Sequence, residues 1–413
     1  MAGAFGGQSA SVPAHLPRTP IGRALADRGL LRPPTLRTDE TRGASRLELF
    51  FDLAFVLVIA ELATSLREDV SLHTALVTAG LFTVVWWSWM SSTLYANRFD
   101  HDDVLFRCNK LAGMAAVVGM AAAVSDATGK YAVAFVLCYV AIRLLLLLQY
   151  TRAYRHVEAA RGGIRIYLIG AGAGAVLWTA SLAVDGPTRY VLWGLGVLVD
   201  AAAPVRVTAS RTQVPLHLEH LPDRFSLFVI LVLGESVAAV AHGVHDASWA
   251  VGSVLAGGVC FVLAVALWWS YFDLAGAGAK HLLQQAGGAT STIAHDVYVY
   301  SQLPLCLALA GVGVGIEGIV LGGTDEVGAG LRTLLSGGVA LYLVTIGVTN
   351  AVMDRGIGSG WWWAALAAVV AVGDAVLDVP ALAVAGVLAG LVGVVVVTGL
   401  EQEARGNVDL EAL

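Results

Sequence analysis

Ionisable side chains interrupt the long apolar segments of this chain at only a few positions. Glu48 and Asp52 lie four residues apart, so they share one face of a helix, and Arg46 lies within a turn of them. Glu235 follows Arg224 by 11 residues inside another apolar segment. At a rise of about 1.5 Å per residue, this spacing places Glu235 near the middle of a bilayer. Charged groups are costly at that depth, so they indicate a function or an internal partner.

Arg143 and Asp200 are two further ionisable residues deep within apolar segments. Such residues can form a structural ion pair, or they can line a path for ions or substrates. Arg143 is expected to pair either with Asp200 or with Glu235. If Glu235 carries a proton or a cation, Glu235→Gln should insert normally and lose most activity, because an amide cannot titrate. The candidate path comprises Glu48, Asp52, Arg143, Asp200, Arg224 and Glu235.

A second group of polar residues falls at segment ends that are expected to face the cytoplasm. Acidic clusters of this kind can bind a cation, or a pyrophosphate through magnesium, because hard cations prefer oxygen ligands. Solvated carboxylates that favour the start of a helix are the alternative. The four cysteines have no CxxC spacing, so neither a disulfide framework nor a metal site is predicted. The group comprises Asp100, Asp102, Asp103, Arg107, His220, Asp273, His295 and Asp296.

The composition places these residues in a membrane protein. Hydrophobic residues make up 57% of the chain and charged residues 14%, against about 25% charged residues in a soluble domain. This deficit excludes an ordinary globular enzyme and predicts an all-α, polytopic membrane helical bundle. Spans of about 20 residues are predicted at 48–66, 72–95, 104–125, 130–150, 163–184, 189–208, 224–243, 248–274, 295–321, 331–353, 361–378 and 380–400.

The distribution of basic residues predicts how the bundle is oriented. With twelve spans and both termini in the cytoplasm, most basic residues gather on the cytoplasmic side, as the positive-inside rule requires. Residues 1–43 are rich in Arg, Pro and Gly and have no apolar core, so they predict a disordered cytoplasmic tail and no signal peptide. Residues 401–413 predict a short acidic cytoplasmic tail. The basic residues left on the outer side are Arg67, Lys130, Arg189 and Arg332.

The second half of the chain echoes the first. Arg46-Leu-Glu-Leu-Phe-Phe-Asp-Leu corresponds to Arg224-Phe-Ser-Leu-Phe-Val-Ile-Leu, and Trp86-Trp-Ser corresponds to Trp268-Trp-Ser. Chance similarity among apolar segments is the alternative to a duplication. We predict one transmembrane repeat over 44–210 and a second over 211–400, each with six spans.

The duplication also predicts a polar cluster at the centre of the bundle. Six spans per repeat give both halves the same orientation, related by an axis along the membrane normal. The first helices of the two repeats should then meet near this axis. We therefore expect Arg46, Glu48 and Asp52 to converge with Arg224 and Glu235.

Four motifs of the chain resemble those of a known bacterial family. They are Arg46-x-Glu48-Leu-Phe-Phe-Asp52-Leu-x-Phe55, His220-x-x-Asp223-Arg224-Phe-x-Leu-Phe, Ile230-Leu-Val-Leu-Gly234-Glu235-Ser236 and Leu267-Trp-Trp-x-Tyr271-Phe-Asp273. This combination is similar to the low temperature requirement protein A (LtrA) family. The chain departs from the family pattern at Asp223, where Glu is usual, and at Gln302, where His is usual. The resemblance implies a multi-pass protein of the bacterial inner membrane and no established activity.

Three functions are compatible with these features. The first, which we favour, is a transporter or channel for a small solute or ion, with its path between the two repeats. The second is a membrane-embedded enzyme acting on a lipid or prenyl substrate through the cytoplasmic polar group. The third is a non-catalytic membrane protein that adapts the bilayer to cold. The expected partners are the lipid bilayer and a small solute, ion or lipid ligand, without nucleic acid. No cofactor and no oligomeric state are assigned.

Overall fold

The computed structural model describes residues 30–37, 45–100, 102–209, 221–276, 289–324, 327–353, 360–376 and 379–411. Nearly all of these residues are helical. The helices are α2 (Arg46–Glu68), α3 (Leu72–Arg98), α4 (Val104–Val124), α5 (Ala132–His156), α6 (Arg161–Ala180), α7 (Pro187–Ala209), α8 (Leu221–Asp246), α9 (Val251–Trp269), α11 (Ala289–Gly322), α12 (Ala329–Met353), α13 (Gly360–Val376) and α14 (Ala381–Glu411). Short 3-10 turns follow α5 (Glu158–Ala160) and α6 (Ser181–Ala183), and a π-helical turn (Ser270–Gly276) extends α9.

The predicted polytopic helical bundle is confirmed. Among the described residues, 11 helices are long and apolar enough to cross a membrane, and a shorter apolar helix lies at Trp362–Asp374 within α13. The break predicted between the last two spans is present, because α13 ends at Val376 and α14 begins at Ala381. The fourth span extends further than predicted, to His156. Arg143 therefore lies near the middle of α5.

Polar N-caps fix where the first spans begin. The Ser45 hydroxyl accepts a hydrogen bond from the backbone N–H of Glu48, and the Glu48 carboxylate accepts one from the Ser45 N–H. This capping box satisfies two donors that the first turn of α2 leaves without an intrahelical partner. At the starts of α3 and α4, the side chains of Ser71 and Asp103 accept a hydrogen bond from the backbone N–H of Thr74 and Phe106, respectively.

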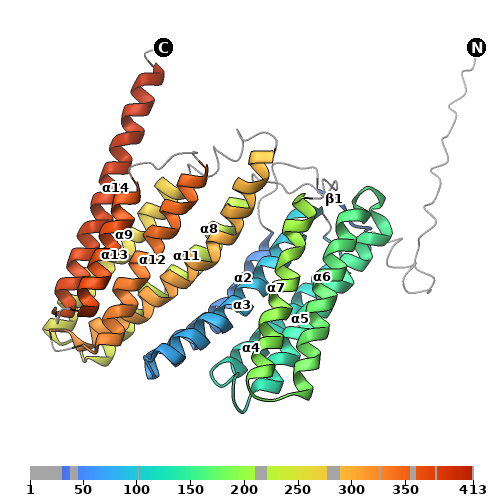
Figure 1. Cartoon of the computed structure of the whole chain (residues 1–413), viewed down its shortest axis with the longest axis horizontal. Helices are drawn as coiled ribbons and strands as arrows, with labels where there is room; N and C mark the ends of the chain where they lie inside the picture. Colours follow the sequence, from blue (N-terminus) through green and yellow to red (C-terminus); the bar gives the residue numbers. More distant parts are fainter. Residues whose placement is uncertain are drawn as a thin grey trace, which may run out of the picture.

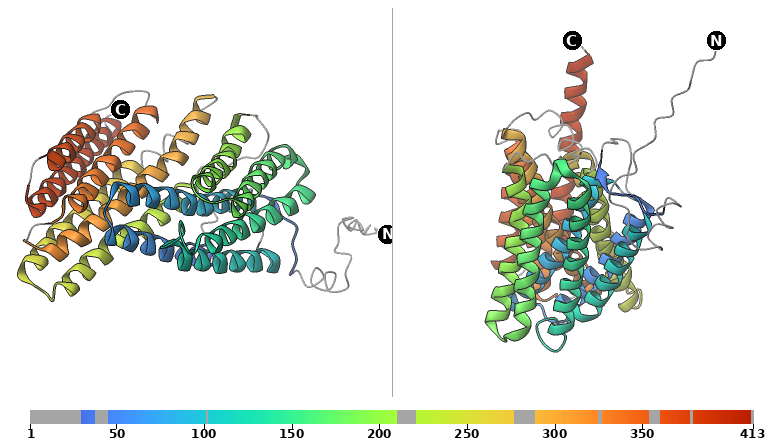
Figure 2. Two further views of the ribbon diagram at one scale, coloured as in Figure 1. Left: turned by 60° about the horizontal axis from the view of Figure 1, so that its bottom comes forward. Right: turned by 90° about the vertical axis from the view of Figure 1, so that its right-hand side faces the viewer.

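The helices form two packed groups with a seam between them. Figures 1 and 2 show α4–α7 at one end of the molecule and α12–α14 at the other, with α2, α3, α8 and α11 between them. In the first group α2 packs against α4, α4 against α5, α5 against α6 and α6 against α7. In the second group α8 packs against α11, α11 against α12, α12 against α13 and α14 against α9. The seam is formed where α2 contacts α8 and α11 and where α3 contacts α11.

Large side chains fill the seam, and apolar side chains cover the outside. Trp86, Trp89 and Phe55 are almost completely buried, whereas Val176 and Leu198 are exposed on the outer faces of α6 and α7. Contiguous apolar surface of this kind marks a membrane-facing protein. The bundle therefore presents hydrocarbon-compatible surface outward and buries several of its ionisable groups.

A short N-terminal segment, residues 30–37, crosses the ends of α3 and α4, and we call it the strap. Its strand β1 (Thr35–Leu36) pairs antiparallel with β2 (Phe99–Asp100). The backbone N–H of Val104 donates to the Leu30 carbonyl at 3.1 Å, and that of Arg37 donates to the Arg98 carbonyl at 3.0 Å. Backbone hydrogen bonds thus hold the strap against the start of α4.

Candidate functional site

A buried ion pair joins the first helices of the two groups across the seam. Arg224 Nη2 of α8 lies 3.0 Å from Asp52 Oδ1 of α2, and both side chains are buried. The same carboxylate oxygen accepts a hydrogen bond from the indole N–H of Trp89 on α3, at 2.9 Å. Three helices therefore converge on one carboxylate. The predicted contact between Asp52 and the start of α8 is present.

Two more charges complete what we call the Asp52 cluster: Glu48, Asp52, Trp89, Lys110 and Arg224. Glu48 is buried, and its Oε2 lies 3.8 Å from Arg224 Nη1. Lys110 of α4 is also buried, with its ammonium 4.3 Å from the ring centre of Phe51. It interacts electrostatically with both carboxylates. The cluster holds two acidic and two basic groups, so it is neutral as a whole when all four are ionised.

The Asp52 cluster keeps unused hydrogen-bonding capacity. Asp52 Oδ2 and Arg224 Nη1 are buried, and neither forms a hydrogen bond within the described part of the chain. Buried polar atoms normally have a partner, and an exception indicates a bound water, a ligand or a functional role. The free carboxylate oxygen and the free guanidinium N–H group give the cluster both an acceptor and a donor for a small polar ligand.

A second ion pair lies wholly inside the first group, and we call Trp87, Arg143 and Asp200 the Asp200 cluster. Arg143 Nη1 of α5 lies 2.8 Å from Asp200 Oδ2 of α7, and the Arg143 side chain is fully buried. The indole N–H of Trp87 donates to the same oxygen at 2.8 Å. Arg143 thus pairs with Asp200, and the alternative pairing with Glu235 is not formed. Arg143 Nε and Nη2 form no hydrogen bond with any described residue.

Helix α3 donates a hydrogen bond to each of the two clusters, through Trp87 and Trp89, which are two residues apart. Such positions face opposite sides of a helix, because each residue turns it by about 100°. Trp89 therefore reaches α2 and α8, whereas Trp87 reaches α7. The Trp87 ring also stacks on Tyr300 of α11, with 6.4 Å between ring centres. Tyr300 in turn donates to the Ala201 carbonyl at 2.5 Å, so α11 contacts the Asp200 cluster from across the seam.

Glu235 does not join the Asp52 cluster, contrary to the prediction. It is partly buried on α8, and the 11 residues between it and Arg224 separate them by about 16 Å along the helix. Arg46 is exposed at the start of α2 and does not join the cluster either. Close helix contact near Glu235 comes from Gly313 of α11, where an added Cβ would lie 3.5 Å from Ser236. Gly234 faces open space.

The predicted cytoplasmic polar group separates into smaller contacts. Asp103 forms an ion pair with Arg152, and the exposed Asp102 pairs with Arg107 at 2.8 Å. Asp273 lies in the π-helical turn after α9, and Asp296 lies on α11. Within the described residues, no three His, Cys, Asp or Glu side chains come together as a metal site would require. The position of His220 and the side chain of His295 lie outside the described part of the chain.

Asp103 fastens the strap to the bundle, and this contact should depend on pH. Burial raises the pKa of Asp103, but hydrogen bonds from Arg152 and from the N–H groups of Phe106 and Arg32 outweigh burial and hold the pKa below its ordinary value. A carboxyl with a lowered folded-state pKa stabilises the fold above its unfolded pKa of about 3.9. This stabilisation is lost as the pH falls through the folded-state pKa.

We therefore expect amide exchange in the strap, corrected for intrinsic rates, to stay slow from neutral pH to about pH 4 and to rise below it. Asp103→Asn should give fast strap exchange even at neutral pH, because the amide loses the ion pair with Arg152. Asparagine still caps a helix, so the variant isolates the loss of charge. Asp102→Asn is the matched control. Slow exchange in Asp103→Asn at neutral pH would contradict this role.

These features define a class of protein: a polytopic helical membrane protein that pairs its ionisable residues inside the bundle. The model of the bacterial low temperature requirement A protein (LtrA) family matches residues 43–397. The chain belongs to this family. It is also 27% identical over 289 residues to an uncharacterized protein of Rhizobium meliloti (strain 1021), covering 67% of this chain and 69% of the relative. No solved structure matches the chain.

Some residues of the site could not be identified from the sequence. Lys110 is not among the site residues predicted from the sequence, because it lies near the start of a predicted span. The structure places it, buried, in the Asp52 cluster. The two copies of the Trp-Trp-Ser motif differ in burial. Trp86 and Trp87 are buried, whereas Trp268 and Trp269 are exposed.

Proposed function

We propose that the protein is a transporter or channel for a small ion or solute, with its path along the seam between the two groups of helices. The observation that carries this proposal is the Asp52–Arg224 pair at 3.0 Å. It is a buried ion pair that crosses the seam and leaves one acceptor and one donor unused. Ionisable residues at membrane depth commonly mark ion or substrate pathways, because their burial is costly without a function.

The packing of the helices supports two six-span repeats over 44–210 and 211–400. The chain of contacts from α2 to α4, α5 and α6 has the same order as that from α8 to α11, α12 and α13. The first helices, α2 and α8, touch at the seam. Substrate sites of repeat-built transporters lie at the interface between repeats. A path beside Asp52 and Arg224 follows this rule.

The charges of the Asp52 cluster suggest how a path would open. Arg224 has two carboxylates within reach, Asp52 at 3.0 Å and Glu48 at 3.8 Å. A proton or cation that binds Asp52 neutralises it and weakens its hold on Arg224. Arg224 then shifts toward Glu48, and the cluster carries one net positive charge while the ion is bound. The ion pair across the seam is thereby coupled to ion binding. The Asp200 cluster holds α3 in place from the other side.

We further propose that the protein lies in the bacterial inner membrane with both termini in the cytoplasm. The bias of basic residues toward one set of loops supports this orientation. The strap and the C-terminal end of α14 lie on the same side of the bundle (Figure 1), in agreement with an even number of spans. The enzyme interpretation has less support, because Asp102 and Asp103 are engaged by arginines.

Reconstitution into liposomes tests transport directly. We expect protein-dependent flux, followed with pH-sensitive and cation-sensitive dyes, and a loss of about tenfold or more in Asp52→Asn, because the amide has no negative charge to attract a cation and does not exchange a proton by titration. Glu61→Gln is the matched control, since Glu61 is an exposed carboxylate on the same helix. Asp52→Glu should restore part of the flux.

Glu235→Gln, assayed beside these variants, tests whether the path extends along α8. Loss of flux in that variant would place Glu235 on the path. Two results would contradict the proposal: absence of flux for every ion tried with wild-type protein, or full flux in Asp52→Asn at normal insertion.

A further inference from the structure

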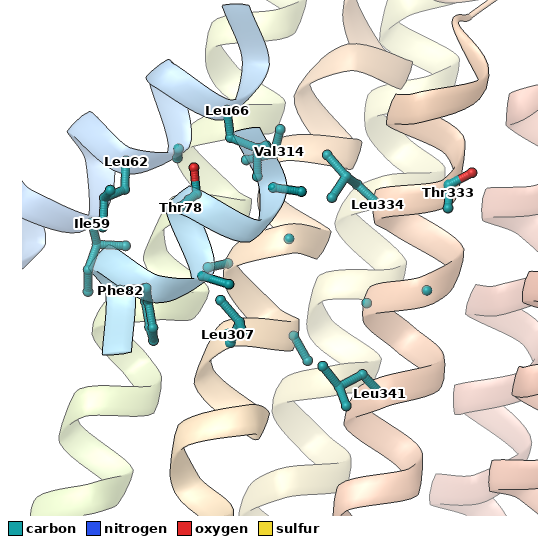
Figure 3. Close-up of a pocket in the computed structure, with 18 residues that line it drawn as sticks. Ile59, Leu62, Leu66, Thr78, Phe82, Leu307, Val314, Thr333, Leu334 and Leu341 are labelled. Carbon is teal, nitrogen blue, oxygen red and sulfur yellow. The ribbon is translucent and has the colours of Figure 1, made fainter. Parts of the chain in front are cut away.

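A cavity of about 270 Å³ opens at the seam, on the side of the bundle away from the start of α2. It lies between the second half of α2, the first half of α3 and the facing parts of α11 and α12 (Figure 3). The Asp52 cluster lies toward the other end of α2, so the cavity is a separate feature. Its apolar lining includes Ile59, Leu62, Leu66, Phe82, Leu307 and Val314.

Small residues create this space where larger ones would close it. An added Cβ at Gly337 of α12 would meet no atom within 4 Å, so this face of α12 borders open space. At the adjacent Gly338, an added Cβ would lie 2.8 Å from Val312 Cγ2 and 2.9 Å from the Ala308 carbonyl. Helix α12 thus packs closely on α11 through one face. Its next face is left uncovered beside α2 and α3.

The chemistry of the cavity fits a hydrocarbon chain. Its only hydroxyl groups are those of Thr78 and Thr333, whereas a bound water needs two to four polar partners. All four bordering helices are candidate membrane spans, so the opening faces the acyl region of a bilayer. If this apolar cavity stayed empty, all the residues that line it would lose dispersion contacts. A hydrocarbon chain from the surrounding bilayer would restore those contacts.

A basic residue adjoins the lining of the cavity. Arg67 follows the lining residue Leu66 and forms an ion pair with Glu317 of α11, three residues beyond the lining residue Val314. About a third of the Arg67 side chain, 33%, remains exposed. A guanidinium has five N–H donors, so one carboxylate contact leaves others free for a phosphate. Arg67 also lies at the end of its span, at the depth of lipid headgroups.

We propose that this cavity binds one acyl chain of an anionic glycerophospholipid whose phosphate lies beside Arg67. The chain fills the space bordered by Gly337, and the headgroup is held at the end of α2. The bound lipid thereby contacts both groups of helices at the seam. This inference does not depend on transport, because the site is defined by its shape and lining alone.

Photo-crosslinking tests the proposal on the full chain. The wild-type protein is placed in nanodiscs that contain phosphatidylglycerol with a diazirine in its acyl chain, and labelled peptides are mapped by mass spectrometry. Labels should concentrate on the lining residues of α2, α3, α11 and α12. Gly337→Leu should reduce this labelling by about tenfold, because its side chain occupies space for several methylene groups. Gly258→Leu is the matched control, since Gly258 of α9 also faces open space but lies away from the cavity.

Further variants test the cavity from a second helix and test the role of Arg67. Gly311→Leu fills the cavity from α11 and replaces Gly337→Leu if that variant fails to insert. The double variant Arg67→Gln with Glu317→Gln should bring labelling by phosphatidylglycerol down to that by phosphatidylcholine, without reducing the latter. Labels spread evenly over exposed faces such as those of Val176 and Leu198 would overturn the site. Equal labelling of Gly337→Leu and Gly258→Leu would overturn it as well.

Discussion

Replacing Asp52 by alanine should lower the free energy of unfolding by about 3–5 kcal/mol, because it leaves Arg224 buried without its counter-ion. The guanidinium would lose the carboxylate at 3.0 Å and keep only Glu48 at 3.8 Å. The indole N–H of Trp89 would lose its acceptor in the same step. Few single substitutions outside a core cavity cost this much. Thermal unfolding of purified protein in detergent measures the change.

The double variant Asp52→Leu with Arg224→Met removes both charges of the pair. Its stability therefore shows what the ion pair as a whole contributes, whereas a single variant shows the cost of leaving one charge unpaired. Replacing a buried ion pair by apolar residues of similar size is often neutral or stabilising. We therefore expect the double variant to unfold close to the wild type, well above either single variant. Glu61→Ala is the control, because Glu61 is exposed on the same helix. A cost below about 1 kcal/mol for Asp52→Ala would show that water reaches Arg224 and screens it.

The meeting of Asp52 and Arg224 could be predicted because it follows from the order of the chain. Matching motifs at the starts of α2 and α8 indicated two similar halves, and similar first helices were expected to meet at the centre. The same reasoning does not hold for Glu235, because residues of one helix need not lie close together in space. Eleven residues along a helix amount to about 16 Å. Arg224 meets α2, and Glu235 lies beyond reach of the same carboxylate.

The tryptophan contacts could not be derived from residue type. An indole N–H donates when it is buried beside an acceptor, and a sequence motif does not specify which face of a helix is buried. The two copies of the Trp-Trp-Ser motif illustrate this limit: Trp87 donates to Asp200, whereas Trp269 is exposed. Trp89 has no tryptophan counterpart in the second half, where Tyr271 follows Ser270.

Lys110 shows that a position near a helix end does not fix the direction of a long side chain. The positive-inside rule counts basic residues close to span ends, and Lys110 lies only seven positions into α4, which begins at Val104. Its long side chain can reach either the membrane surface or the bundle interior. The aromatic rings of Phe51 and Phe106 and two nearby carboxylates favour the interior. Those neighbours come from tertiary packing, so sequence position alone does not decide between the two directions.

Asp200→Asn should have the second large effect, a loss of about 3–5 kcal/mol in the free energy of unfolding. Asparagine can still accept a hydrogen bond from Trp87, but it no longer compensates Arg143, whose side chain is fully buried. Arg143 already has two nitrogens without a hydrogen bond among the described residues. The substitution would remove its only ionic partner there. Asp185→Asn is the matched control, because the Asp185 side chain is 94% exposed in its pair with Arg189.

A double-mutant cycle distinguishes this ion pair from general damage to the core. Arg143→Leu and Asp200→Asn should each destabilise strongly, and the two together should cost clearly less than the sum of the single losses, because the double variant leaves no unpaired charge. Trp87→Phe should cost only about 1 kcal/mol, since it removes a neutral donor and keeps an aromatic ring against Tyr300. Additive losses, or an Asp200→Asn variant as stable as Asp185→Asn, would contradict the pair's role. In that case α3 would be held by packing of Trp87 on Tyr300, and the charge of Asp200 would be available for a ligand.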